Sequence, residues 1–376
     1  MLAGSALILA ALVSASHGLE YVKVRQNDKE VTLQGKLVVQ ADDGGLMLLT
    51  ADGQLHSMQP ADFVSRRSDD LPLVPLKQEQ VAKELLATLP AGFEVHTTAR
   101  YVILHNTSRA YAQWCGALFE RLYAGFVNFW KNKGFTLHEP EFPLVCIVFA
   151  DQASYERWAK AELGEATRNV IAYYSLKTNL VTMYDLTGTE SLRRANDRRG
   201  SAAQINQMLA QPNAEKMVAT IVHEATHQIA YNCGLQTRFA DIPLWVSEGI
   251  AVYFEAPDLS NSKGWRSIGE VNRLRIGDFR KYTMSRPSES LKSLIVDDKR
   301  FRDPRQAVDA YAEAWALNYF LIRQKPKEYK AYMQLMATKQ PLIWSEPAER
   351  LKEFQDIFGD LSNLDADFLK YMRKVR

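Results

Sequence analysis

The chain has 376 residues, a formal net charge of +2, 47% hydrophobic residues and 24% charged residues. These values are those of an ordinary folded protein, and the length suffices for one large domain or two to three smaller ones. A charge so close to zero gives no basis for a nucleic-acid partner or a strongly charged substrate, so we expect neither.

The first residues resemble a leader. Leu2 to Val13 form an apolar run interrupted only by Gly4 and Ser5, and small residues follow at 14–16. We therefore predict a signal peptide at 1–18 and export to the periplasm, the cell surface or the medium. No Lys or Arg precedes the run, so an uncleaved anchor and a buried N-terminal helix are the alternatives. No other stretch approaches the ~20 apolar residues of a membrane span, so we expect none beyond such an anchor.

A small β-module is predicted at residues 19–70. Short extended runs alternate with turn signals such as Asp42-Asp43-Gly44-Gly45 and Asp52-Gly53. The runs lie at 21–24, 31–33, 36–39, 46–49 and 54–58. A linker with Pro72 and Pro75 follows, and we assign residues 76–376 to a second domain.

The second domain alternates between strand and helix patterns before it becomes helical beyond residue 213. We expect extended chain at 93–106, helix at 108–133, a buried strand at 144–149, helix at 152–163, a hairpin from 170–176 and 180–186, and a solvated polar loop at 187–212. For Cys115, Cys146 and Cys233, three buried thiols are favoured over one disulfide with a free thiol.

A helix is predicted between Asn213 and Gly234. Asn213 is the expected N-cap, Glu215 lies in the first turn, and Gly234 ends the pattern. The segment between them is mostly apolar.

Within this helix lies His223-Glu224-Ala225-Thr226-His227. Histidines four residues apart project from one helix face, so their imidazoles can converge on one metal ion. Glu224 can then approach a metal-activated water as a general base. The alternative is a helix with two histidines on its surface or in the core. It is weaker, because two buried imidazoles without partners would be costly in an apolar segment.

A third ligand is expected from a second helix that begins near Pro243. Glu248 is the acidic residue in the N-terminal half of this helix and has apolar neighbours. Alone it would be interpreted as an exposed helix carboxylate. A catalytic zinc site needs three protein ligands and an open position, and Glu248 is the best-placed third ligand.

These motifs resemble those of the gluzincin metallopeptidases, in particular an exported branch of the peptidase MA-like group. The resemblance covers roughly residues 93–340 and depends on three motifs: His223-Glu224-x-x-His227, Trp245-x-x-Glu248-Gly249-x-Ala251 and Tyr311-Ala312-Glu313-Ala314-Trp315-Ala316. It implies that Zn²⁺ is bound by His223, His227 and Glu248, with Glu224 as the catalytic base.

The chain departs from this family in two respects. Thermolysin-like members have an Asp four residues after the glutamate ligand, where this chain has Val252. The carboxylate that orients a histidine ligand must therefore come from elsewhere. No Gly-x-Met-Glu-Asn-like segment lies upstream, which favours an endopeptidase over an aminopeptidase.

The resemblance also implies a tyrosine that stabilises the oxyanion. Tyr311 is our candidate, because related enzymes carry a Tyr at a comparable distance downstream. A purely structural role in an aromatic core with Trp315 and Tyr319 is the alternative, and Tyr173 and Tyr174 are rival donors. In this family an edge strand lies over the metal cleft and pairs with extended substrate. Either strand of the predicted hairpin fits that role, or both belong to the sheet core.

We thus predict an α+β protein: a zincin-like domain with a small mixed sheet, a His-Glu-x-x-His active-site helix and a helical C-terminal half, preceded by a small antiparallel β-module. The predicted function is exported, zinc-dependent hydrolysis of peptide or protein substrates. The alternative is a catalytically silent zincin-fold scaffold that uses the β-module to bind a partner.

Overall fold

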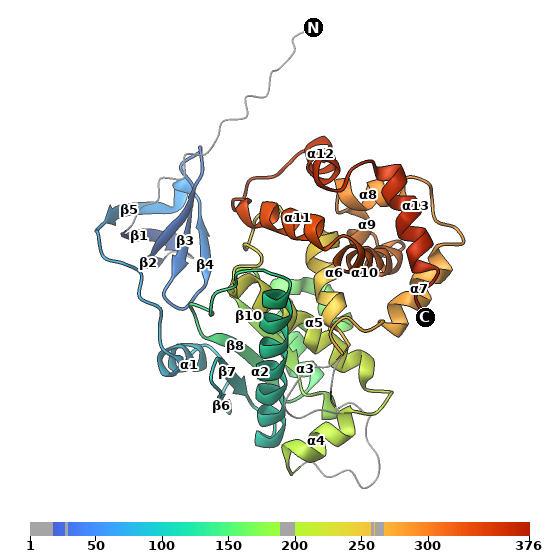
Figure 1. Cartoon of the computed structure of the whole chain (residues 1–376). Helices are drawn as coiled ribbons and strands as arrows, with labels where there is room; N and C mark the ends of the chain where they lie inside the picture. Colours follow the sequence, from blue (N-terminus) through green and yellow to red (C-terminus); the bar gives the residue numbers. More distant parts are fainter. Residues whose placement is uncertain (1–17, 27–28, 189–199, 257–258, 260–266) are drawn as a thin grey trace.

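The computed structural model describes residues 18–26, 29–188, 200–256, 259 and 267–376 (Figure 1). The signal peptide predicted at 1–18 lies outside these residues except for Gly18. Within the described part, no helix has both the length and the apolar character that crossing a membrane requires.

The N-terminal module is a five-stranded antiparallel sheet with the order β4-β3-β2-β1-β5. Its strands are β1 (Leu19–Gln26), β2 (Lys29–Gln40), β3 (Leu46–Thr50), β4 (Leu55–Met58) and β5 (Phe63–Ser68), with a short 3₁₀ helix at Pro60–Asp62. The sheet has its own small core, which includes Val22, Val24 and Leu48. The predicted antiparallel sheet is confirmed. The runs at 31–33 and 36–39 form one strand, β2, and β5 was not predicted.

A second, mixed sheet has the order β6-β7-β8-β10-β9. Its strands are β6 (Glu94–Thr97), β7 (Tyr101–His105), β8 (Leu144–Phe149), β9 (Ala172–Tyr174) and β10 (Leu180–Tyr184). The three central strands β7, β8 and β10 are parallel, whereas β6 and β9 pair antiparallel at the two edges. The hairpin expected around residue 178 therefore contributes one edge strand, β9, and one interior strand, β10.

Helices cover both faces of this sheet. Tyr174 of β9 stacks on Tyr231 of α5 (Glu215–Asn232), and α2 (Arg109–Asn132) packs against both α5 and β7. On the other face, Tyr184 of β10 contacts Tyr155 of α3 (Gln152–Leu163). Helix α1 (Gln78–Leu86) precedes the sheet and contacts β7.

The C-terminal half is helical, as predicted (Figure 1). Its further helices are α4 (Ala202–Leu209), α6 (Leu244–Phe254), α7 (Arg273–Tyr282), α8 (Ser290–Val296), α9 (Lys299–Arg302), α10 (Ala307–Gln324), α11 (Pro326–Thr338), α12 (Pro347–Phe358) and α13 (Leu361–Met372), and 3₁₀ helices lie at Gly164–Asn169 and Leu186–Gly188. Two details differ from expectation. Helix α4 lies in the segment predicted as a polar loop, of which 189–199 is not described. Helix α5 has Ala214 rather than Asn213 as its N-cap. All three cysteines are buried thiols, as favoured.

The centre of the helical half is the contact between α6 and α10, where the backbones approach closely at Gly249. A Cβ atom at this position would lie 2.0 Å from Nδ2 of Asn318 and 2.9 Å from the carbonyl oxygen of Ala314. The Asn318 amide cannot move away without loss of two hydrogen bonds, because it donates to the carbonyls of Trp245 and Ala314 at 2.8 and 2.9 Å. Glycine is therefore required beside Glu248 for α6 to pack on α10.

We predict that Gly249→Ala lowers the free energy of unfolding by about 1–3 kcal/mol, because the added methyl group overpacks this contact. Thermal unfolding followed by circular dichroism measures the change. Gly277→Ala in α7 is the matched control, since a Cβ there meets no atom within 4 Å. The control should leave Tm unchanged or raise it, because alanine restricts the unfolded chain. Equal Tm values for the two variants would contradict the packing argument.

Candidate metal centre

The two predicted histidine ligands lie on the face of α5 that is directed toward α6. Both are buried, with 8% exposure for His223 and 9% for His227. Their Nε2 atoms are 3.1 Å apart. Glu248 of α6 completes a group of three donors whose ligand atoms all lie within 4.8 Å of one another, and this group can hold a metal ion.

The distances fit a small tetrahedral ion. Glu248 Oε2 lies 3.1 Å from Nε2 of His223, and Oε1 lies 3.5 Å from Nε2 of His227. A tetrahedral zinc site with bonds of about 2.0–2.1 Å has donor atoms about 3.3–3.4 Å apart. Two nitrogens and one carboxylate are also a donor set that zinc accepts.

Glu255 supplies the carboxylate partner that sequence reasoning could not identify. Its Oε1 accepts a hydrogen bond from Nδ1 of His223 at 2.9 Å, which directs Nε2 of the same ring toward Glu248 and His227. Glu255 is the C-cap of α6 and lies seven residues, or two turns, after Glu248 on the same side of the helix. An acidic residue at the end of such an apolar helix was the sequence feature that could have identified it.

Glu255 is itself fixed by residues at the start of α7. Arg275 Nη2 donates to Oε1 at 3.2 Å, and Nδ2 of Asn272 donates to Oε2 at 3.2 Å. The carboxylate is 7% exposed, so these donors replace the water that it loses on burial. The orientation of His223 thus depends on a segment that lies far beyond α5 in the sequence.

The electrostatics of the centre favour a cation. Burial lowers the pKa of His223, but hydrogen bonds to Glu248 and Glu255 outweigh it and raise the pKa well above its usual range. Burial raises the pKa of Glu248, but electrostatic attraction and hydrogen bonds to the two neighbouring histidines lower it strongly overall. The site therefore stabilises positive charge between these side chains, and a metal ion can replace the proton there.

Glu224 lies beside this group without belonging to it. Its Oε2 accepts a hydrogen bond from the backbone N–H of Tyr174 at 2.8 Å, which connects the helix to the edge strand β9. Burial raises the pKa of Glu224, and the neighbouring histidines oppose this effect. A carboxylate with a raised pKa accepts a proton more readily near neutral pH.

Tyr311 is brought to the same place from α10. Its ring centroid lies 6.4 Å from that of His223, and the Arg275 guanidinium lies 5.5 Å above its ring. The negative charge of Glu248, together with burial, raises the pKa of the phenol, so it stays protonated and able to donate. The rivals are engaged elsewhere: Tyr173 packs on Tyr155, and the Tyr174 hydroxyl donates to Asn179 at 2.8 Å.

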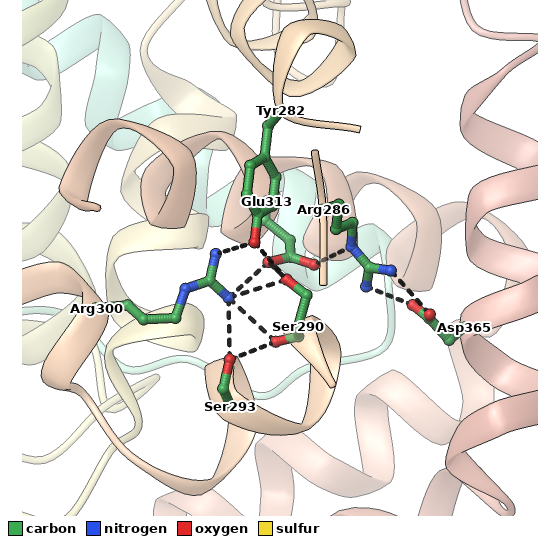
Figure 2. Close-up of polar contacts among 7 residues, drawn as sticks. All are labelled: Tyr282, Arg286, Ser290, Ser293, Arg300, Glu313 and Asp365. Carbon is green, nitrogen blue, oxygen red and sulfur yellow. Dashed lines mark hydrogen bonds and ion pairs between the residues drawn. The ribbon is translucent and has the colours of Figure 1, made fainter. Parts of the chain in front are cut away.

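A buried charge cluster anchors α10 two residues beyond Tyr311. Figure 2 shows Glu313 between two guanidinium groups: Arg286 Nε donates to Oε1 and Arg300 Nη1 to Oε2, each at 2.7 Å. Arg286 also donates to Asp365 of α13 at 2.6 and 2.9 Å. Because Glu313 is fully buried, its negative charge depends on these two guanidinium groups for compensation. The cluster therefore restrains the rotation of α10 that directs Tyr311.

A second cluster anchors the beginning of α6. Asp298 Oδ1 accepts from the backbone N–H of Leu244 at 2.9 Å and from Nη1 of Arg350 at 3.3 Å. The same guanidinium pairs with the buried Asp241. The first turn of α6 thus has an anionic partner, as a helix N-terminus favours, and Glu248 follows one turn later.

A cavity of about 760 Å³ lies along the N-terminal part of α5. Lys216, Ala219 and Thr220 line it and lie one to two turns before His223 on the same helix face. Glu255 and Arg275 contribute to its wall. Glu255 is therefore both part of the cavity wall and the hydrogen-bond partner of His223.

We predict that Glu255→Gln weakens zinc binding by about 10- to 100-fold, because the amide is a poorer acceptor for the imidazole N–H of His223. Competition with a chromophoric chelator measures the affinity. Glu270→Gln is the control, since Glu270 lines the same cavity but is exposed. An affinity unchanged by Glu255→Gln would show that Glu255 does not support the ligand.

Comparison with known proteins adds one similarity. Residues 217–343 match a family model described as a protein of unknown function (DUF1570). This segment spans nearly all of α5 and the whole of α6 to α11. No curated protein matches the chain. Over the segment that carries His223, Glu224, His227, Glu248 and Tyr311, the chain is thus similar to a family to which the description assigns no activity.

Proposed function

We propose that this chain is an exported zinc metallopeptidase of the gluzincin type that cleaves peptide or protein substrates internally. One observation carries the proposal: His223, His227 and Glu248 converge within 4.8 Å, and Glu224 lies next to them without being one of the three. A site that only stores a metal, as in a catalytically silent scaffold, has no use for this extra carboxylate.

Zinc in this site would polarise a peptide carbonyl and bring the pKa of a water molecule toward neutrality. The three donors would hold the ion from one side, because they come from two adjacent helices, and leave the other side to substrate. Glu255 would keep the imidazole of His223 in the tautomer that presents Nε2 to the ion.

Glu224 is assigned the role of proton carrier. In the proposed reaction its carboxylate takes the proton of the attacking water and transfers it to the leaving nitrogen. The Tyr174 N–H at 2.8 Å leaves the second carboxylate oxygen free for this exchange. Burial strengthens the basicity that the first step requires.

Tyr311 is assigned the role of oxyanion donor. Its protonated phenol lies near His223 and Glu248, and hydrogen-bond donors at such a position stabilise the negative charge that develops on the carbonyl oxygen. The charge cluster around Glu313 limits the motion of the helix that carries this phenol.

The edge strand β9 is assigned to substrate binding. Strand β10 has β8 and β9 as neighbours on its two sides, so among the hairpin strands only β9 has a free edge. An extended peptide can add to such an edge by main-chain hydrogen bonds. An active-site helix beneath the edge strand of a mixed sheet is the arrangement of a zincin-like fold, which we include in the proposal.

We predict that Glu224→Gln lowers kcat by at least ~100-fold while one zinc per chain is retained, because only the proton carrier is lost. Tyr311→Phe should lower kcat by about 100- to 1,000-fold, with zinc content again unchanged. Hydrolysis of a quenched-peptide library and elemental analysis measure both quantities. Glu215→Gln, an exposed carboxylate in the first turn of α5, is the control. Full turnover by either test variant would remove that residue from the mechanism.

A further inference from the structure

The turn of the β9–β10 hairpin is held from two sides, although it is a short surface connection. It comprises Leu176 to Asn179 and begins two residues after Tyr174, whose N–H contacts Glu224. Movement of the turn would therefore disturb the hydrogen bond between Tyr174 and Glu224. The position of Glu224, the proposed base, thus depends on the contacts that hold the turn.

The inner side of the turn is bound to α5 by a buried amide network. Asn179 and Asn232 exchange side-chain hydrogen bonds at 2.9 and 2.7 Å. Gln228 Nε2 donates to the carbonyls of Asn179 and Val145 at 2.9 and 3.0 Å. Asn179 has φ of 63°, a left-handed conformation that asparagine tolerates better than most residues. This network fixes the turn on the helix that carries the metal ligands.

The outer side of the turn is bound by the N-terminal β-module. The backbone N–H of Leu55, at the start of β4, donates to the carbonyl of Lys177 at 2.8 Å. Arg238, in the loop after α5, donates from Nη1 to the carbonyl of Leu176 at 3.2 Å and from Nη2 to that of Gly53 at 2.9 Å. One guanidinium thus bridges the β3–β4 turn of the module and the hairpin turn.

The environment of Arg238 is unusual for a cation. Burial lowers the pKa of its guanidinium, and both of its described hydrogen bonds end on backbone carbonyls rather than on a carboxylate. Partial burial of a charge without a carboxylate partner has a free-energy cost, which hydrogen bonds to carbonyl oxygens reduce. The fork of an arginine can bind two carbonyls at once, which a lysine cannot do in the same geometry.

The module turn is shaped for this contact. Gly53 has φ of +83°, and a Cβ there would lie 2.9 Å from the ring of Phe142 in the second domain. Only glycine permits both the conformation and the approach. The chain beyond the module returns to the same turn, since the N–H of Leu76 donates to the carbonyl of Ala51 at 2.7 Å.

We propose that the β-module is a structural part of the candidate active site. Through the N–H of Leu55, and through Arg238 as a bridge, it fixes the β9–β10 hairpin and keeps the Tyr174 N–H hydrogen-bonded to Glu224. Arg238 is thereby a positioning residue, although it lies outside the group of metal ligands. The effect on turnover rests on the proposed peptidase function, whereas the effect on the hairpin does not.

Hydrogen–deuterium exchange of the full chain, with peptides covering 171–180, tests the proposal. Arg238→Met should accelerate exchange in this segment by about tenfold or more, because the charge-assisted hydrogen bonds are lost. kcat should fall by a similar factor, with zinc content unchanged. The control is Arg25→Met, which removes an exposed arginine from β1 of the same module and should change neither quantity.

Arg238→Lys retains the charge and the fold, and it should accelerate exchange in 171–180 less than Arg238→Met does. If Arg238→Met does not fold, exchange in Arg238→Lys tests whether Arg238 fixes the hairpin. Unchanged exchange in the hairpin would overturn the proposal, as would faster exchange with unchanged kcat. If the wild type cleaves no peptide, the proposed function fails, and the exchange data still decide whether the module fixes the hairpin.

Discussion

Two imidazoles and a carboxylate, largely shielded from water, are held within 4.8 Å of one another, and this requirement governs the surrounding structure. Such a group is costly to bury unless positive charge lies between its members. The raised pKa of His223 and the lowered pKa of Glu248 express the same preference for a cation. We interpret the arrangement as a metal centre for this reason, since an ordinary packed core would avoid it.

The helices around the centre share one means of support, a buried pairing of carboxylate and guanidinium. Glu255 at the end of α6 is paired with Arg275, and Asp298 at its beginning is paired with Arg350. Glu313 of α10 is paired with Arg286 and Arg300, as Figure 2 shows. Each pairing has a fixed geometry. It therefore restrains rotation of its helix more strongly than apolar contacts alone would. The positions of Glu248, His223 and Tyr311 follow from these restraints.

Local patterns in the sequence predicted the elements that carry the site. The spacing of His223 and His227 determines a common helix face wherever the helix lies, and the apolar run 144–149 is typical of a buried strand. Strand β5 was missed because most of its residues are exposed and charged or polar, so it has no strand-like alternation. Helix α4 was missed because polar residues dominate the segment in which it lies.

Contacts between distant segments could not be predicted. Glu255 was visible as an acidic residue seven positions after Glu248, but its partner Arg275 follows twenty positions later in the sequence, and no local rule joins them. Which hairpin strand forms the edge depends on the order β8-β10-β9, and strand order is not encoded in periodicity. The contact of Arg238 with the β-module likewise joins segments that are far apart in the chain.

The most direct test of the account is the zinc content of the purified chain and of its His227→Ala variant, measured by elemental analysis. The account predicts one zinc per wild-type chain and loss of zinc in the variant, because two donors cannot retain an ion that needs three. Absence of zinc from a wild-type chain purified in the presence of zinc, or equal zinc in both proteins, would contradict it.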